Sequence, residues 1–235
     1  MKIEEIIKEI KPLDEAAMQS ARARQDTLTK PRGSLGRLEE LSIQLAGMKA
    51  DPLPVVERKA VIVMAADHGV AREGVSAYPP EVTAQMVLNF LRGGAAINVL
   101  ARQAGARVTV VDIGVAVEFE AAPGLIRRKV MCGTRNQAQG PAMTRAEAEQ
   151  ALQVGVDVLN EEAARGLDIV ATGDMGIGNT TPSSAIAAAL TPIRAAGFGP
   201  QSLPGTSSNR GSARSDSGCG QRRTGGKRQP TPFCS

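Results

Sequence analysis

The sequence is poor in aromatic residues and in residues that build metal or redox sites. Aromatic side chains make up 2% of the 235 residues, Trp is absent, and His68 is the single histidine. The three cysteines form no C-x-x-C pair, and an odd count suits neither a zinc knuckle nor a disulfide framework. We therefore expect no metal site, no cofactor, and a core built from Val, Ile, Leu, Met and Ala.

Long apolar runs are missing as well. No segment approaches the roughly 18 consecutive apolar residues that a membrane helix needs. The first residues, MKIEEIIKEIKPLDEA, are charged and amphipathic and lack the apolar stretch of a signal peptide. These two absences predict a cytoplasmic protein with no membrane partner.

Positive charge gathers at one end of the chain. Residues 192–235 carry six Arg and one Lys against Asp216, a net charge of +6, so residues 1–191 carry −2 of the total of +4. Gly, Ser, Pro, Arg and Lys supply 27 of these 44 residues, and such a segment buries too little apolar surface to offset its ordering entropy. We expect a disordered tail. A tail that binds nucleic acid is the alternative, which the lack of interleaved aromatic residues disfavours.

Apolar runs alternate with helical periodicity before this tail. A continuous apolar run predicts a buried strand over residues 59–69. Further strands are expected over residues 107–115 and 168–174, with a weaker one over residues 125–131. Helical patterns occupy residues 3–10, 13–25, 38–48, 80–103 and 145–165. The paired Gly93 and Gly94 should break the fourth helix, because glycine is a poor helix former. Strands that alternate with helices predict an α/β fold with a parallel sheet and flanking helices.

The sequence predicts where two helices begin. Thr144 and Glu147 have the spacing of a capping box, in which a hydroxyl and a carboxylate satisfy each other's backbone N–H groups. Thr180 or Thr181 is expected to cap the last helix, with Pro182 in its first turn.

The strongest site signal is the glycine-rich turn between the last strand and this last helix. Gly173-Asp174-Met175-Gly176-Ile177-Gly178-Asn179-Thr180-Thr181 would bring backbone N–H groups close to a ligand at a helix N-terminus, an arrangement that suits a phosphate. A tight turn that holds nothing gives the same pattern.

Three further segments have polar residues where a ligand could bind. Asp67 and His68 follow the first strand, and the His is either a general base or ligand-orienting group, or a residue bonded to backbone. Ser76, Tyr78 and Gln85 could line a pocket for a flat apolar ligand, or belong to a plain loop and helix. The segment 30–36, KPRGSLG, offers cations for a phosphate or only solvated linker charge.

Long segments of the chain resemble a known enzyme family. TKPRGSLGRLEELSIQLAGM, AADHGVAREGVSAYPPEVTAQMVLNFLRGGAAINVLAR and TGDMGIGNTTPSSAIAAAL closely resemble nicotinate-nucleotide–dimethylbenzimidazole phosphoribosyltransferase, in order, from about Lys11 to Thr191. The resemblance implies a Rossmann-like α/β domain over residues 51–191 and a small helical domain that includes residues 1–50, in a homodimer. It implies transfer of phosphoribose from nicotinate mononucleotide to 5,6-dimethylbenzimidazole, which gives α-ribazole 5′-phosphate and nicotinate in cobalamin biosynthesis.

The resemblance also implies roles for individual residues. Asp174 stands where family members more often have Glu, and its carboxylate would stabilise a positively charged sugar. Ser76 and Gln85 match positions implied to hold the benzimidazole, and Gly176, Gly178, Asn179 and Thr180 match the family's phosphate turn. Tyr78, Met175 and Ile177 are expected to contact substrate as well.

The resemblance stops after Thr191. Family members continue with further strands, a phosphate-contacting Lys and a Glu proposed as general base, and nothing in residues 192–235 matches them. We therefore expect an α/β domain that is incomplete at its C-terminus, with an out-of-frame or truncated end and little transfer activity. The alternative is a non-catalytic product that keeps a partial nucleotide pocket.

Overall fold

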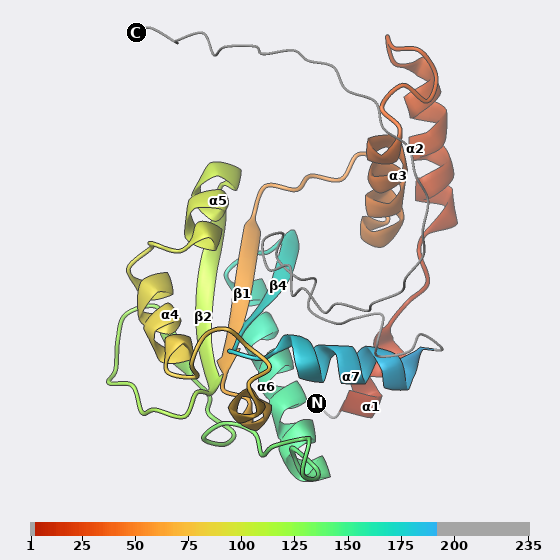
Figure 1. Ribbon diagram of the computed structural model, residues 1–235. Helices are drawn as coiled ribbons and strands as arrows, with labels where there is room; N and C mark the ends of the chain where they lie inside the picture. Colours follow the sequence, from red (N-terminus) through yellow and green to blue (C-terminus); the bar gives the residue numbers. More distant parts are fainter. Residues whose placement is uncertain (1–2, 192–235) are drawn as a thin grey trace, which may run out of the picture. The chain divides into compact units, whose positions relative to one another are not determined.

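Four parallel strands form the centre of the fold in the computed structural model, which describes residues 3–191 (Figure 1). They are β1 (Lys59–Ala66), β2 (Ala106–Gly114), β3 (Leu125–Arg127) and β4 (Ile169–Met175), in the spatial order β3-β2-β1-β4. The predicted α/β fold with a parallel sheet is therefore confirmed. The chain steps outward from β1 to β3 and then returns to the far side of β1. This reversal makes the carboxyl ends of β1 and β4 a topological switch point, where open α/β sheets bind ligands.

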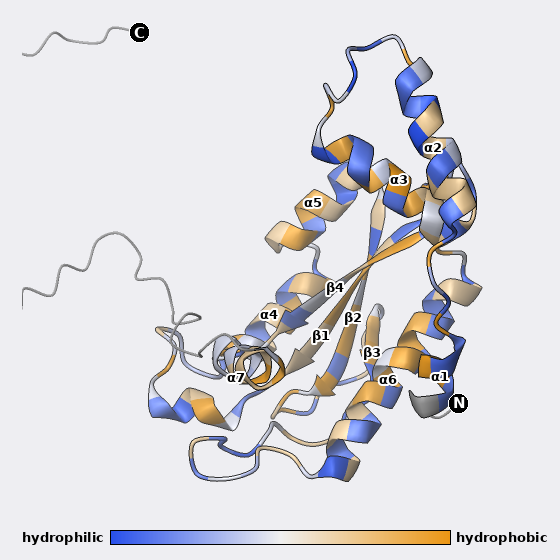
Figure 2. Cartoon of the chain, turned by 90° about the vertical axis from the view of Figure 1, so that its right-hand side faces the viewer, coloured by the Kyte–Doolittle hydropathy of each residue, from blue (hydrophilic) through white to orange (hydrophobic). Residues whose placement is uncertain are grey.

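Helices cover both faces of the sheet, which explains the continuous apolar runs in its strands. Val61, Val63 and Ala65 of β1 pack with α4 (Val82–Leu91). Ile62, between them, packs on the opposite face with α6 (Arg145–Ala164). Figure 2 shows the apolar strands enclosed between these helices. The predicted break at Gly93 and Gly94 is confirmed, since α4 ends at Leu91 and α5 (Ala96–Ala104) begins beyond the glycines.

A buried carboxylate ties β2 to α6. Glu162 is 1% exposed and accepts hydrogen bonds from Thr109 Oγ1 at 2.8 Å and from Arg107 and Arg165, each at 3.0 Å. Burial by itself raises the pKa of this carboxyl, but the hydrogen bonds from Thr109 and Arg107 outweigh that effect and hold the pKa below its usual range. The side chain is thus an ion that its partners keep ionised.

The N-terminal helices are α1 (Ile3–Glu9), α2 (Glu15–Thr27) and α3 (Arg37–Lys49). α2 begins at a side-chain cap, because Asp14 Oδ1 accepts the Ala17 N–H at 2.8 Å. α2 and α3 lie side by side, joined by bonds from Asp14 N to Gly47 O at 2.9 Å and from Gln25 Nε2 to Ser42 Oγ at 2.8 Å (Figure 1). The division into domains 1–50 and 51–191 stays a prediction, and the proposed tail, 192–235, lies outside the described residues.

The structure corrects two details of the sequence-based assignment. The third strand is shorter than expected and ends at Arg127. Beyond Arg127 the backbone still donates to β2, from Arg128 N to Asp112 O and from Val130 N to Ile113 O, each at 2.9 Å, but it no longer forms a regular strand. The capping box at Thr144 and Glu147 is confirmed. The predicted cap of α7 (Thr180–Leu190) is wrong, since the N-cap residue is Asn179 and its side chain makes no cap hydrogen bond.

Candidate functional site

The glycine-rich turn lies at the carboxyl end of β4, directly against the end of β1. Gly176 is buried, and a Cβ atom built there would stand 2.2 Å from Ala66 O and 2.8 Å from two ring atoms of His68. Gly178 has φ +82°, and a Cβ atom there would meet Ala71 and Val75 at 3.3 Å. Glycine at 176 thus allows a close approach of backbone to backbone, and glycine at 178 allows a left-handed conformation.

The turn presents backbone donors that the protein leaves unused. Across residues 3–191, the N–H groups of Gly176, Gly178 and Thr180 have no hydrogen-bond acceptor. The Asn179 N–H does have one, because it donates to Gly176 O at 3.0 Å. Free N–H groups at a helix N-terminus, where the helix dipole is positive, attract anions. The phosphate role of the turn stays a prediction.

The missing cap on α7 has a local cause. Asn179 Nδ2 donates to Asp174 Oδ2 at 2.6 Å, so its side chain is turned toward the strand and away from the helix N–H groups. Asp174 is an exposed residue next to the carboxyl end of strand β4, and only one of its two carboxylate oxygens takes part in this bond. The pair therefore holds a carboxylate beside the free donors with one oxygen available.

His68 flanks the turn at the end of β1. Burial lowers the pKa of its imidazole, and the negative charges of Asp174 and Asp67 oppose that effect only in part. At neutral pH the ring is therefore uncharged. Asp67 is fixed by the Ala116 N–H, which donates to its Oδ2 at 2.7 Å, while its Oδ1 is buried with no partner in the described part of the chain.

The residues predicted to hold the benzimidazole are only partly gathered. Ser76 adjoins Val75, which contacts Gly178, and Ser76 Oγ accepts the Tyr78 N–H at 3.2 Å. The Tyr78 ring is 67% exposed. Gln85 is exposed on α4, and no hydrogen bond links its side chain to another group within residues 3–191. The substrate roles of these residues stay predictions.

Sequence reasoning missed Thr83, which joins α4 to the turn. Its hydroxyl oxygen accepts the Ile177 N–H at 3.1 Å, across 94 positions of sequence, and its side chain is fully buried. A lone Thr in the first turn of an amphipathic helix is unremarkable in sequence. The one indication in the sequence was that Thr83 lies in a segment with Tyr78 and Gln85, which were predicted to contact a ligand.

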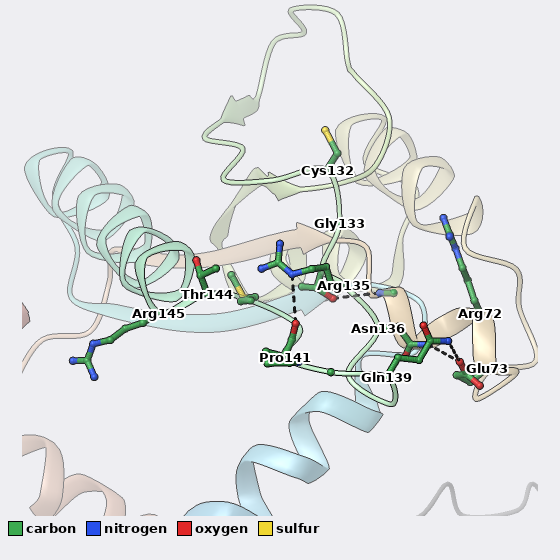
Figure 3. Close-up of a pocket in the computed structure, with 14 residues that line it drawn as sticks. Arg72, Glu73, Cys132, Gly133, Arg135, Asn136, Gln139, Pro141, Thr144 and Arg145 are labelled. Carbon is green, nitrogen blue, oxygen red and sulfur yellow. Dashed lines mark hydrogen bonds between the residues drawn. The ribbon is translucent and has the colours of Figure 1, made fainter.

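An open cavity of about 1260 Å³ lies beside the end of β1 (Figure 3). Its walls are the 3-10 helix Gly69–Glu73, the loop 132–141 and the start of α6. Glu73 accepts from the amides of Asn136 and Gln139, and Arg135 is paired with Glu147. Glu73, Arg135, Asn136 and Gln139 are therefore already engaged by protein groups.

The basic segment 30–36 is engaged within its own helical region. Lys30 Nζ lies 2.7 Å from Glu39 Oε1, which also accepts the Leu35 N–H at 3.1 Å. The hydrogen bond from Lys30 is the main reason that the pKa of Glu39 is lowered. The Lys30 ammonium is thus paired and largely shielded from solvent, and so it is not solvated linker charge. The phosphate role of this segment stays a prediction.

Comparisons with known proteins match the chain to one family. A family model described as "Phosphoribosyltransferase" matches residues 10–209. The chain belongs to this phosphoribosyltransferase family. A protein of Roseiflexus sp. (strain RS-1) named nicotinate-nucleotide–dimethylbenzimidazole phosphoribosyltransferase is 61% identical over 189 residues, which are 80% of this chain and 54% of that protein. A protein of the same name from Desulforudis audaxviator is 60% identical over 185 residues, 79% of this chain and 52% of that protein.

A solved structure supports the same membership of the phosphoribosyltransferase family. The crystal structure of CobT from Thermus thermophilus has a TM-score of 0.72 and 55% sequence identity, covering 74% of this chain and 53% of that chain. The predicted family is therefore confirmed. The chain spans about half the length of the curated relatives it matches.

Two kinds of feature are absent from the described residues. Residues 3–191 contain no group of three or more His, Cys, Asp or Glu side chains placed to hold a metal ion. In the same part of the chain, no helix combines the length and the apolar character required to cross a bilayer.

Proposed function

We propose that this chain binds nicotinate mononucleotide at the turn 174–180 and transfers its phosphoribosyl group to 5,6-dimethylbenzimidazole, giving α-ribazole 5′-phosphate and nicotinate. One observation carries the proposal: three unused backbone donors and a held carboxylate meet at the switch point between β1 and β4. The relatives with about 60% identity are named for this reaction. We further propose a cytoplasmic homodimer, the assembly that the family resemblance implied.

The chemistry assigns separate tasks to the donors and to the carboxylate. The phosphate of the nucleotide accepts the free N–H groups of Gly176, Gly178 and Thr180, which anchors the ribose nearby. In the transfer, the bond from C1′ to the nicotinate nitrogen breaks and its electron pair leaves with nicotinate. C1′ then carries positive charge, which the Asp174 carboxylate stabilises in place. The unprotonated ring nitrogen of the incoming base attacks C1′ from the opposite face, and the proton on its second ring nitrogen is released to water.

The pairing of Asp174 with Asn179 prepares this carboxylate. The amide fixes Oδ2, so Oδ1 can face the sugar without a rotation at the moment of reaction. Asp174 is one methylene shorter than the Glu that is more frequent in the family, and we assign to the Asn179 contact the role of directing the shorter side chain. Met175 and Ile177 flank the carboxylate and the donors and are assigned to substrate contact, with Ser76, Tyr78 and Gln85 on the benzimidazole side.

Binding and turnover test this proposal separately. Isothermal titration should show that nicotinate mononucleotide binds more tightly than nicotinate riboside, which lacks the phosphate. Asp174→Asn keeps the shape and removes the charge, so it should leave the Kd within about threefold while α-ribazole 5′-phosphate formation falls at least ~100-fold. Asp174→Glu is the matched control that keeps the charge, and its rate should stay within about tenfold of the parent chain.

Each result has its own meaning. Equal affinity for the two nicotinate ligands would refute a phosphate site at the turn. Equal turnover in the Asp174→Asn variant would refute the role of the carboxylate. The rate at which the unsubstituted chain forms α-ribazole 5′-phosphate shows how far its transfer activity is impaired.

A further inference from the structure

Thr83 holds the middle of the phosphate turn in position. Its Oγ1 accepts the Ile177 N–H at 3.1 Å, and this is the one side-chain hydrogen bond that the turn's three central residues, 176–178, make within residues 3–191. Ile177 lies between Gly176 and Gly178, the two residues with the greatest backbone freedom. A hydrogen bond to Ile177 therefore restricts the backbone where its conformational freedom is greatest.

The bond acts on a whole peptide plane. The Ile177 N–H belongs to the planar unit that joins Gly176 to Ile177, so its direction fixes that plane and limits the two planes beside it. With this N–H engaged by Thr83, the N–H groups of Gly176 and Gly178 on either side remain for a ligand. Thr83 thereby separates the structural donor of the turn from its ligand-binding donors.

Thr83 is suited to this task because α4 is itself immobilised. Thr83, Val87 and Phe90 follow one another at helical spacing on the buried face of α4, with exposed fractions of 0%, 0% and 9%. Val87 and Phe90 are part of the core cluster formed with β1 and β2. The hydroxyl is therefore fixed to the sheet through packed side chains, and it transmits that rigidity to the end of β4.

We propose that Thr83 is a positioning residue for phosphate binding, which it promotes through the Ile177 N–H. The inference rests on the proposed function, because it assigns the turn to a phosphate. Thr83 touches no reacting atom, and its effect should therefore be confined to the part of the affinity that the phosphate contributes. Preorganised donors bind without the cost of ordering the turn at the moment of binding.

The test uses the full chain and two substitutions of one residue. Thr83→Val keeps the shape and removes the acceptor, whereas Thr83→Ser keeps the hydroxyl. Without the Thr83 acceptor the Ile177 N–H has no partner, which is costly, and the turn is no longer held in its binding conformation. Thr83→Val should therefore raise the Kd for inorganic phosphate and for nicotinate mononucleotide about tenfold, and Thr83→Ser should raise it less than about threefold. The Kd for nicotinate riboside should change less than about twofold in both variants, a selectivity that general destabilisation would not produce.

Amide exchange in the parent chain provides a readout that needs no variant. The Ile177 N–H should exchange with solvent more slowly than the N–H groups of Gly176 and Gly178, and addition of phosphate should slow the latter two. Fast exchange at Ile177 would overturn the proposal even if Thr83→Val fails to fold. Unchanged phosphate affinity in a folded Thr83→Val variant would overturn it too. If phosphate binds at the turn and nicotinate mononucleotide does not, the proposed substrate fails while the role of Thr83 stands.

Discussion

Gly176→Ala should disable the turn, and Gly173→Ala, three residues earlier, should not. A Cβ atom at 176 would stand 2.2 Å from Ala66 O, and a Cβ atom at 173 would have its nearest neighbour at 3.6 Å, an ordinary contact. Neither glycine has a positive φ, so the comparison isolates steric collision from backbone strain. The two variants add the same methyl group to the same strand and turn.

The size of the effect follows from what is able to move. His68 can rotate away, but Ala66 O belongs to the central strand, which is paired with β2 on one side and β4 on the other. The turn must therefore shift by about 1 Å to restore an ordinary carbon–oxygen contact, and overpacking of this kind costs about 3 kcal/mol. For a chain of this length that corresponds to a fall in Tm of about 6–12 °C. Phosphate affinity should fall at least ~10-fold, because hydrogen bonds weaken steeply when donors are displaced.

Differential scanning calorimetry and phosphate titration of both variants test this reasoning. Gly173→Ala should change the free energy of unfolding by no more than ~0.5 kcal/mol and leave the phosphate affinity unchanged. If Gly176→Ala has the same Tm and Kd as Gly173→Ala, the turn does not pack against Ala66 and the geometry of the site is wrong.

Two further substitutions test the buried Glu162 and the half-buried His68. Glu162→Gln should lower the free energy of unfolding at pH 7 by about 2 kcal/mol, against at most ~0.5 kcal/mol for the exposed Glu161→Gln. Because folding lowers the pKa of Glu162, its contribution to stability is present above the ordinary value of 4.5 and is lost as the pH falls through the lowered pKa. In urea denaturation, the difference in free energy of unfolding between the parent chain and Glu162→Gln should therefore be smaller at pH 3.5 than at pH 7. His68→Gln should flatten the fall in Tm between pH 7 and pH 5, because folding lowers the pKa of His68 and protonation below its ordinary value of 6.5 favours the unfolded chain. An unchanged slope would contradict the half-buried neutral ring.

The sequence predicted the elements of the sheet because their signals are local. β1 and β2 are buried on both faces, and so their apolar runs are continuous and long enough to stand out. The break between α4 and α5 was predictable for the same reason, since paired glycines act on the helix that contains them. The order β3-β2-β1-β4 was not predicted, because pairing depends on contacts between segments far apart in the chain.

Assignments at the ends of elements were less accurate for a physical reason. A cap is decided by competition between hydrogen bonds, and the sequence shows only the candidates. Thr144 caps α6 as its spacing indicates, because Glu147 completes the reciprocal pair. Asn179 occupies the cap position of α7 but gives its amide to Asp174, a partner that belongs to the preceding strand. The prediction chose a threonine because helix-start rules do not include a strand carboxylate.

The same competition explains why an open helix end is useful at this place. An ordinary side-chain cap, such as Asp14 on α2, uses an N–H group that a ligand would otherwise bind. At α7 the one side chain able to cap is held by Asp174, and the backbone of the turn is held instead by Thr83, from another helix. The hydrogen bond that fixes the turn therefore uses none of the N–H groups that are left free for a ligand. The turn can be rigid and unsatisfied at once, and these are the two conditions that a preorganised anion site requires.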